Sequence, residues 1–534
     1  MEESFDIVIV GSGSAGAVLA NRLSADGRHS VCVIEAGPPD RSLAITLPMG
    51  LFWLMDSRRF NWCYQTAPQA HLGGRTIPVP RGRTLGGSSS INGMVYIRGH
   101  PSDYDGWAAM GCTGWGWDDV LPYFRRSEHN ERLGGSPLHG SEGELWVSDN
   151  PAPHPLTEVF IAAGEALQIP RNDDFNGPRQ EGLGRFQTTT RDGLRWSTAD
   201  AFLRPALGRP NLAVRTGAMV RRLVFEGRRA AAVETDRGLV RACTAVILSA
   251  GAIGSPQILQ LSGVGDPARL RPLGIAPVIE SPEVGANFHD HPHAPVVLTL
   301  GMGQSYGISW LGIPMILRDA LRFLYRRRGL FASNIIEAGG FVHTRPGLTA
   351  PDVQFHFSVA HRSRQPGRVI AWGHGCSVSA CVLRPESRGR VDILSADPLA
   401  PPRIDPNMLA EEADRATLLA GIRLARRILS SEGFRRLGAR EIAPGPGVGD
   451  DADALTAYLR EKTITVYHPV GSCRMGADAR AVVDPRLRLR GAEALYVVDA
   501  SIMPRIVSGN TNAPVIMIAE KAADMIRADL RQRP

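Results

Sequence analysis

The sequence predicts an α/β fold, α+β overall, in which a Rossmann-like dinucleotide-binding domain is joined to a second domain that contains strands and helices. Near the N-terminus, a glycine-rich turn lies between an apolar strand and a helix. Far along the chain, strand-like segments at 351–360 and 377–383 precede a helix-like segment at 410–430. The length of 534 residues also exceeds what one hydrophobic core commonly holds, so two structural units are expected.

The glycine-rich turn has the full dinucleotide-binding pattern. Residues 5–10 are an apolar run typical of a buried parallel strand, and a second strand at 30–34 leads into an acid. Between them, the G-x-G-x-x-G turn consists of Gly11, Ser12, Gly13, Ser14, Ala15 and Gly16. Its glycines permit the tight turn, the approach of a pyrophosphate and close packing of helix on strand. The helix N-terminus adds N–H donors and a positive dipole for the phosphates.

The acid after the second strand is Glu35, which can bond both hydroxyls of an adenosine ribose. Ala36 and Gly37 follow it, where an arginine would be needed to pair with a 2′-phosphate. The sequence therefore disfavours NADP. The fingerprint alone does not distinguish FAD from NAD.

Composition and charge exclude several classes of protein. Apolar residues make up 43% and charged residues 21%, as in globular proteins and unlike disordered or collagen-like chains. The formal net charge is +7, and all but two of the 60 basic residues are arginine, scattered rather than clustered, so no nucleic-acid partner is predicted. Seven cysteines without a CxxC pair predict reduced thiols and a cytoplasmic location. Neither a signal peptide nor a membrane span is predicted.

Three further regions, together with the fingerprint, resemble the glucose–methanol–choline (GMC) family of flavin-dependent oxidoreductases. They read RGRTLGGSSSING and MVYIRG at 81–99, AVILSAGAIGSP at 245–256, and a C-terminal region with YHPVGSCRMG at 467–476, ALYVVDASIMP at 494–504 and GNTNAPVIMIAEKAADMI at 509–526. The match spans nearly the whole chain in the family's order and spacing. Within the family, the chain is similar to bacterial alcohol dehydrogenases of the choline and sorbose group.

The resemblance implies FAD as the cofactor and assigns residues to it. The fingerprint with Glu35 and Ala36 would hold the ADP part, while the backbone of Val220 would meet the adenine. The remaining expected cofactor contacts are Arg83, Gly87, Ser88, Asn92, Gly93, Met94, Val95, Ala250, Gly251, Asp499, Ala500, Asn510, Asn512 and Ala513. Some family members attach FAD covalently through a histidine in the segment that reads SSSIN here. Ile91 lies in that segment and no histidine does, so non-covalent FAD is predicted.

The resemblance also implies a catalytic pair. His468 lies in YHPVGSCRMG, where the family keeps its catalytic histidine, and imidazole is suited to accept a hydroxyl proton near neutral pH. Asn512 matches the family's second catalytic position, where an amide would donate to the substrate oxygen. A helix at 515–526 would direct its N-terminus at the flavin and stabilise negative charge on it.

The implied activity is oxidation of the CH–OH group of a small alcohol to an aldehyde or ketone, by hydride transfer to flavin N5. An O2-using alcohol oxidase and a non-redox hydroxynitrile lyase of the same family are the alternatives. The electron acceptor (a quinone, a dye-like acceptor or O2) stays open. The candidate pocket residues that face the flavin are Met94, Asn334, Glu337, His356 and Tyr467. The carboxylate of Glu337 would favour a polyol or a cationic substrate such as choline.

Segments 1–150, 208–290 and 465–534 are expected to form the FAD-binding domain, and 151–207 and 291–464 the substrate domain. The resemblance implies the GMC fold, in which the substrate domain consists of an antiparallel sheet and helices. The run HDHPH at 289–293 has metal-ligand composition. Yet VGANFHDHP resembles a family segment that joins the domains, so a structural role and no metal are predicted. The stretch 302–330 contains a basic amphipathic pattern, which fits either a substrate-domain helix or a helix touching the inner membrane peripherally. A monomer or a homodimer is expected.

Overall fold

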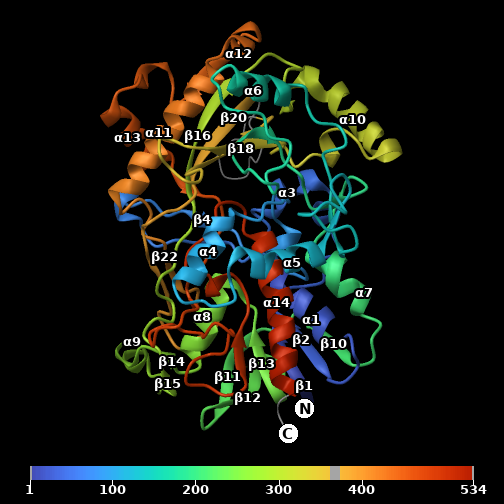
Figure 1. Ribbon diagram of the computed structural model, residues 1–534, viewed down its shortest axis with the longest axis vertical. Helices are drawn as coiled ribbons and strands as arrows, with labels where there is room; N and C mark the ends of the chain where they lie inside the picture. Colours follow the sequence, from blue (N-terminus) through green and yellow to red (C-terminus); the bar gives the residue numbers. More distant parts are fainter. Residues whose placement is uncertain (1–2, 361–372, 532–534) are drawn as a thin grey trace.

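Two β-sheets, one toward each end of the molecule, form the framework of the computed structural model (Figure 1). The structure describes residues 3–360 and 373–531. Within these residues, the first sheet has seven strands in the order β10-β2-β1-β13-β12-β11, with β25 also paired to β13. The strands are β1 (Glu3–Val10), β2 (Val31–Glu35), β10 (Leu212–Thr216), β11 (Val220–Glu226), β12 (Arg229–Thr235), β13 (Gly238–Leu248) and β25 (Leu495–Val497).

The first sheet is parallel where the glycine-rich turn leaves it. Strands β10, β2, β1, β13 and β25 run parallel, whereas β11, β12 and the start of β13 pair antiparallel. The last four residues of β1 and all of β2 are buried, as expected for central strands of a parallel sheet. The carboxyl ends of parallel strands meet at one edge, so the turn after β1 and the acid at the end of β2 lie together there.

The second sheet is antiparallel and has eight strands within the described residues. Six follow the order β23-β16-β20-β19-β18-β7, while β17 and β24 pair with β20 and β16. The strands are β7 (Gly182–Arg185), β16 (Pro292–Thr299), β17 (Gly307–Ile308), β18 (Ala338–Val342), β19 (Val353–Ser358), β20 (Gly373–Val382), β23 (Arg440–Ala443) and β24 (Ile464–Thr465). The predicted strands at 351–360 and 377–383 correspond to β19 and to the end of β20.

Helices cover both sheets. They are α1 (Ser14–Leu23), α2 (Leu43–Thr46), α3 (Leu51–Leu54), α4 (Pro101–Ala109), α5 (Trp117–Ser127), α6 (Leu156–Glu165), α7 (Arg204–Ala206), α8 (Gly251–Leu261), α9 (Pro267–Leu270), α10 (Ile313–Arg326), α11 (Glu412–Leu429), α12 (Glu432–Arg436), α13 (Ala452–Lys462) and α14 (Asn512–Arg531). Helix α1 packs against α14, and α14 against α5. Helix α11, close to the predicted 410–430, packs on β16 and β20. Of the helices that the structure describes, none has the length and apolar character needed to cross a bilayer.

Among the described residues, five short strand pairs lie outside the two large sheets. They are β3 (Tyr64–Gln65) with β4 (Pro78–Val79), β5 (Glu128–Asn130) with β6 (Leu145–Val147), β8 (Thr190–Arg191) with β9 (Leu194–Arg195), β14 (Val264–Gly265) with β15 (Ile279–Glu280), and β21 (Arg390–Asp392) with β22 (Arg403–Asp405). The two large sheets draw their strands from the segments expected for the two domains, with Thr465 of β24 one residue beyond the expected boundary. This placement supports the two-domain division, which we keep as a proposal.

A buried ionic cluster holds the helical layer of the first sheet together. Glu520 of α14 is fully buried and binds Arg22 of α1, with an N–O distance of 2.7 Å, and Arg126 of α5, at 3.0 Å. One carboxylate therefore connects three helices. Because the carboxylate is removed from water, its charge depends on both arginines for compensation.

We predict that Glu520→Gln lowers the free energy of unfolding by about 3 kcal/mol, since it leaves two guanidinium groups without their shared carboxylate. Urea unfolding followed by circular dichroism measures the change. The matched control is Glu432→Gln, which removes an exposed carboxylate from an i,i+4 pair with Arg436 and is expected to have no measurable effect. Equal stability of the two variants would contradict the role of the buried cluster.

Candidate active site

A cavity of about 340 Å³ lies between the two sheets and is lined from both sides. The loops at the carboxyl ends of the parallel strands supply one wall. Strands β16, β19 and β20 of the antiparallel sheet supply the other, through His293, His356, Ser358 and Ser379. The cavity therefore brings the dinucleotide fingerprint next to a group of polar side chains from the second sheet.

Two glycine-bearing loops approach each other at the fingerprint. Gly11 has φ +95°, and a Cβ there would lie 2.6 Å from the carbonyl oxygen of Ser249. A Cβ on Gly87, which has φ +53°, would lie 2.7 Å from the Cα of Gly13. By contrast, the nearest atom to a Cβ on Gly13 would be the Cα of Gly87 at 3.9 Å. The surface at Gly13 is thus left open for the backbone to approach a ligand.

Glu35 is held in place by the fingerprint itself. Its Oε2 accepts hydrogen bonds from the Ser12 amide at 3.0 Å and the Ser12 hydroxyl at 2.8 Å, and its Oε1 accepts from the Gly37 amide at 2.8 Å. Burial raises the pKa of this carboxyl, while these hydrogen bonds oppose the rise. The side chain still lines the cavity, so its remaining lone pairs are placed to accept from ligand hydroxyls.

Three helices begin at the cavity. The first residues of α1, α8 and α14 all line it, and none of the three helices has an acidic residue in its first turn. Their N-terminal dipoles therefore add a positive potential that no acid in their first turns offsets. The Ser14 hydroxyl donates to Oδ1 of Asn512 at 2.7 Å, which ties the starts of α1 and α14 together.

Asp499 fixes the start of α8. Its Oδ2 accepts from the Gly251 amide at 2.9 Å and from the Ser255 hydroxyl at 2.6 Å, while its Oδ1 accepts from the Ser501 amide at 2.8 Å. Burial raises the pKa of this carboxyl. Since these groups occupy both oxygens, Asp499 orients the backbone that faces the cavity.

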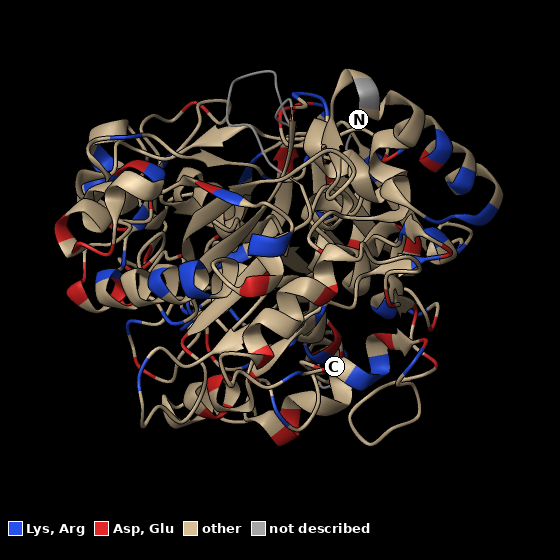
Figure 2. Cartoon of the chain, turned by 90° about the horizontal axis from the view of Figure 1, so that it is seen from above, with Lys and Arg blue, Asp and Glu red and all other residues tan. Residues whose placement is uncertain are grey.

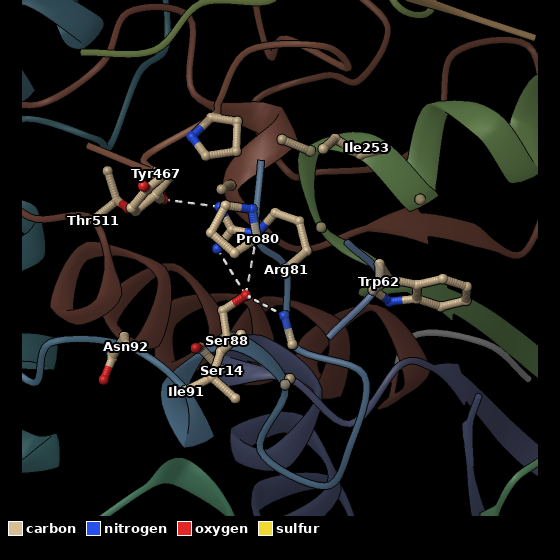
Figure 3. A pocket seen from close by; sticks show the side chains of 18 of the residues that line it. Ser14, Trp62, Pro80, Arg81, Ser88, Ile91, Asn92, Ile253, Tyr467 and Thr511 are labelled. Atoms are coloured by element: carbon tan, nitrogen blue, oxygen red, sulfur yellow. Dashed lines mark hydrogen bonds between the residues drawn. The ribbon is translucent and has the colours of Figure 1, made fainter. Parts of the chain in front are cut away.

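Arg81 and Ser88 brace the loop that leads into His468 (Figure 3). The Arg81 guanidinium donates to the Ser88 hydroxyl at 2.7 Å and to the carbonyl oxygen of Tyr467 at 2.8 Å. Tyr467 has φ +70°, an uncommon conformation for a tyrosine, and its amide donates to Thr465 Oγ1 at 2.7 Å. Hydrogen bonds on both sides of Tyr467 therefore stabilise a strained backbone next to His468.

The tautomer of His468 follows from its neighbour His291. Nε2 of His291 lies 3.0 Å from the Leu383 carbonyl oxygen, which can only accept, so Nε2 carries the proton. Burial lowers the pKa of His291 to about 3, so its Nδ1 is an unprotonated acceptor. That nitrogen lies 3.1 Å from Nδ1 of His468, which must therefore carry the proton. The lone pair of His468 then lies on Nε2.

Nε2 of His468 faces an amide. Nδ2 of Asn510 lies 3.2 Å from this nitrogen, and Oδ1 of Asn510 accepts from Nε2 of Gln354 at 3.1 Å, which turns the amide group of Asn510 toward the histidine. Burial lowers the pKa of His468 well below its usual range, and nearby His291, His356 and Arg81 lower it further. His468 is therefore neutral near pH 7.

Asp290 positions the two histidines relative to each other. Its Oδ1 accepts from the backbone amides of His291 at 2.7 Å and His468 at 2.8 Å, and its Oδ2 accepts from the hydroxyl of Thr465. His289 donates from Nδ1 to the Asn287 carbonyl at 2.6 Å, and its Nε2 accepts from the amide of Ile506 at 3.0 Å. These hydrogen bonds support the structural role predicted for the HDHPH run at 289–293. Across the described ranges, no group of three metal-ligating side chains occurs.

The N-terminal model of the GMC oxidoreductases matches residues 5–293, and the C-terminal model matches residues 385–519. The chain belongs to the GMC oxidoreductase family. The predicted family and fold class are thereby confirmed.

Full-length relatives agree with this assignment. This GMC oxidoreductase is 46% identical to "Alcohol dehydrogenase [acceptor]" of Pseudomonas putida, over 98% of this chain and 95% of that protein. It is 41% identical to "Oxygen-dependent choline dehydrogenase" of Photobacterium profundum, over 98% of this chain and 93% of that protein.

Solved structures show the same fold. Pyridoxine 4-oxidase from Mesorbium loti superposes with a TM-score of 0.88 at 33% identity, over 99% of this chain and 100% of that one. A formate oxidase from Aspergillus oryzae, studied for FAD modification, superposes with a TM-score of 0.91 at 28% identity, over 99% of each chain.

Most of the residues expected at the site of this GMC oxidoreductase line the cavity. The exceptions are Ser12, Gly16, Arg83 and Ala513. Ser12 bonds Glu35 and Gly16 packs against the Gly11 carbonyl, so both act on the shape of the turn. Ala513 is buried in the first turn of α14. The guanidinium of Arg83 lies 5.1 Å from the ring of Trp62, which lines the cavity.

Two expectations about the substrate side were wrong. Glu337 does not line the cavity: Oε1 accepts from the Ser333 hydroxyl and Oε2 from the His154 amide, each at 2.6 Å. Asn334 does not line it either, and its Nδ2 donates to the carbonyl oxygen of Gly93 at 2.6 Å. Met94, His356 and Tyr467 do line the cavity, as expected.

Sequence reasoning missed several cavity residues. Arg81 lies inside a segment that carried the family resemblance, and His293 ends the HDHPH run at 289–293, so the chemistry of both could have been noted there. Ser358 and Ser379 lie on β19 and β20 and gave no local signal, because only strand pairing brings them to the cavity.

Asp290 gives the site a measurable pH dependence of stability. Burial raises its pKa to about 6, from 3.8 for an ordinary aspartate. A carboxyl whose pKa is higher in the folded state stabilises the fold while it is protonated, and this contribution is lost as the pH rises through the folded pKa. Relative to Asp290→Asn, we therefore predict that the wild-type chain loses about 3 kcal/mol of unfolding free energy between about pH 3 and about pH 7.

Urea unfolding of both proteins across this pH range measures the difference. The control is Asp453→Asn, which changes an exposed aspartate of α13 and is expected to leave the pH dependence of stability unchanged. A difference between wild type and Asp290→Asn that stays constant with pH would contradict the prediction.

Proposed function

We propose that this GMC oxidoreductase uses FAD to oxidise the CH–OH group of a small alcohol to an aldehyde or ketone. The observation that carries the proposal is the neutral His468, whose Nε2 lone pair lies beside the Asn510 amide in a cavity that begins at a dinucleotide fingerprint. The alcohol dehydrogenase and choline dehydrogenase names of the relatives support the substrate class.

FAD is the cofactor that the family implies, and the cavity fits it. The open face at Gly13, the N-termini of α1, α8 and α14, and the held carboxylate of Glu35 together suit a pyrophosphate and a ribose. The SSSIN segment offers Ser88, Ile91 and Asn92 to the cavity and no histidine, which supports non-covalent binding. When bound, FAD supplies the two-electron acceptor for a hydride.

Two side chains of the protein act on the hydroxyl proton and on the oxygen of the alcohol. His468 takes the hydroxyl proton of the alcohol at Nε2 and keeps its other proton on Nδ1, donated to His291. Asn510 donates from Nδ2 to the substrate oxygen as negative charge grows on it. We propose Asn510 for this role in place of Asn512, because Asn510 is the residue within hydrogen-bond distance of His468.

The substrate end of the cavity favours an uncharged alcohol. Glu35 and Asp499 are the only carboxylate side chains among the described residues that line the cavity, and both belong to the fingerprint side. Besides these two, the lining includes the apolar side chains of Leu51, Met55 and Ile336 and the hydroxyls of Ser358 and Ser379. A quaternary ammonium would be desolvated there without a carboxylate to pair with, so we propose a neutral alcohol rather than choline as substrate.

We propose a dehydrogenase that passes electrons to a quinone-like or dye-like acceptor, as the Pseudomonas putida relative's name, which includes "[acceptor]", suggests. An oxidase is the alternative, since pyridoxine 4-oxidase shares the fold.

The seven cysteines are all free thiols, which suits the predicted cytoplasmic location. That location and the choice between monomer and homodimer stay predictions.

The test is anaerobic mixing of the purified yellow protein with a panel of alcohols. Bleaching of the flavin absorbance by neutral primary or secondary alcohols, and not by choline, is expected. A choline-only response would contradict the substrate proposal. A flavin that no alcohol bleaches, together with cleavage of a hydroxynitrile, would contradict the reaction class. Admission of air then separates an oxidase from a dehydrogenase by the speed at which colour returns.

The two asparagines give a sharper prediction. We expect Asn510→Ala to slow flavin reduction by alcohol about 100-fold, because it removes a donor to the developing oxyanion. Asn512→Ala should leave the rate nearly unchanged and weaken flavin retention, since Asn512 joins α14 to Ser14 of α1. Stopped-flow absorbance and the flavin-to-protein ratio measure both effects. If Asn512→Ala slows flavin reduction more than Asn510→Ala does, Asn512 is the residue that donates to the substrate oxygen.

His291 provides a second prediction. His291→Phe removes the acceptor that keeps the proton of His468 on Nδ1, so we expect flavin reduction to slow about 100-fold with normal flavin content. His71→Phe, the same exchange at an exposed histidine, is the control and should have the wild-type rate. A wild-type rate in His291→Phe would show that the tautomer of His468 does not depend on this contact.

A further inference from the structure

Helix α10 exposes its apolar side chains to solvent. Leu317, Leu321 and Leu324 are 60%, 55% and 68% exposed, and Trp310 and Tyr325 near its two ends are 77% and 85% exposed. Positions 310, 313, 317, 321 and 324 recur every three or four residues and therefore form one stripe along the helix. This stripe, defined as Trp310, Ile313, Leu317, Leu321, Leu324 and Tyr325, covers the outward face.

The opposite side of α10 makes the contact with the protein. Asp319 and Phe323 are buried, and Phe323 packs against Phe331 with a distance of 6.1 Å between ring centroids. The helix is therefore anchored through a narrow buried edge, on the side opposite the exposed leucines. An exposed apolar surface of this kind, arranged along one helix, indicates a partner outside the chain.

Arginines lie along one side and at one end of the stripe. Arg318 and Arg322 follow one side of it, and Arg326, Arg327 and Arg328 follow the C-terminal end; all five are exposed. Asp319 is the only acid in the stretch 302–330, and it is buried within 3.6 Å of Arg318 and 3.8 Å of Arg322. Figure 2 shows the helix at the edge of the molecule, with its basic positions in blue. The outward face of α10 is thus apolar in the middle and positively charged at its margin.

We propose that α10 docks on the surface of a bilayer that contains anionic phospholipids. The leucines would enter the boundary between headgroups and acyl chains, the arginines would pair with lipid phosphates, and Trp310 and Tyr325 would lie at the headgroup level. A second copy of the chain fits less well, because a two-fold interface would bring the same arginines face to face. The proposal concerns a surface and does not depend on the proposed reaction.

Docking through α10 would bring the membrane close to the cavity. The segment that follows α10, η7 (Leu330–Ala332), packs against α10 and against η1 (Pro48–Gly50). Leu51, the next residue after η1, lines the cavity. The stripe and the cavity wall are therefore connected through two packed segments.

The test is flotation of the purified full chain with phosphatidylcholine vesicles, with and without phosphatidylglycerol. The wild-type chain is expected to float with vesicles that contain phosphatidylglycerol, and less so as salt rises. A triple variant with Leu317→Ser, Leu321→Ser and Leu324→Ser should bind these vesicles about 100-fold more weakly than the wild-type chain does. The matched control is Leu394→Ser with Leu399→Ser, at leucines 63% and 70% exposed elsewhere, which should float like wild type.

A second variant tests the charges without touching the leucines. Arg318→Glu with Arg322→Glu should weaken binding to phosphatidylglycerol vesicles at least about tenfold. Flavin content and the thermal midpoint show that the variants are folded. The proposal is overturned if the wild-type chain does not float, if the control loses binding as the stripe variant does, or if phosphatidylglycerol makes no difference. A wild-type dimer that the stripe variant turns into a monomer, without vesicle binding, would also overturn it in favour of a second copy.

Discussion

The contact between Nδ1 of His468 and Nδ1 of His291 is the interaction on which the chemistry of this site depends. Two imidazoles in such a contact share one proton, and the Leu383 carbonyl decides which of them holds it. The result is a neutral base with its lone pair on Nε2, next to the Asn510 amide. Asp290 supports this arrangement by binding the backbone of both histidines.

The same contact joins two segments of the antiparallel sheet at the cavity. His291 lies directly before β16 of the antiparallel sheet, and His468 follows β24, which pairs with β16. Their side chains meet where the loops of the parallel sheet supply Gly13 and the starts of three helices. One side of the cavity therefore suits the phosphates of a dinucleotide, and the other holds the base and the polar groups around a substrate. Neither sheet forms the site without the other.

Much of this site was predictable from local sequence. The strand, G-x-G-x-x-G turn and Glu35 are consecutive along the chain, so their geometry follows from residue order. The choice between Asn510 and Asn512 was not predictable in this way. The two asparagines lie two residues apart at the start of α14, and the direction of each side chain depends on Gln354 and Ser14 from distant segments.

Other details depend on tertiary packing in the same way. His291 lies in a run of residues with the composition of a metal site. Only its contact with His468 shows that it orients that histidine. The carboxylate of Glu337 could not be excluded from the substrate side until its partners Ser333 and His154 were known. The pattern of α10 predicts an amphipathic helix, but periodicity alone does not say which face is buried. In α10 the leucine stripe is the exposed face.

The account's central claim is that His468 acts as a neutral base. The most direct measurement is the rate constant of anaerobic flavin reduction by a saturating alcohol as a function of pH. Because the pKa of His468 lies well below 6.5, the account predicts a rate constant that does not change from pH 6.5 upward. A rate constant that rises with pH through neutrality would show that His468 must first lose a proton, and would contradict the account.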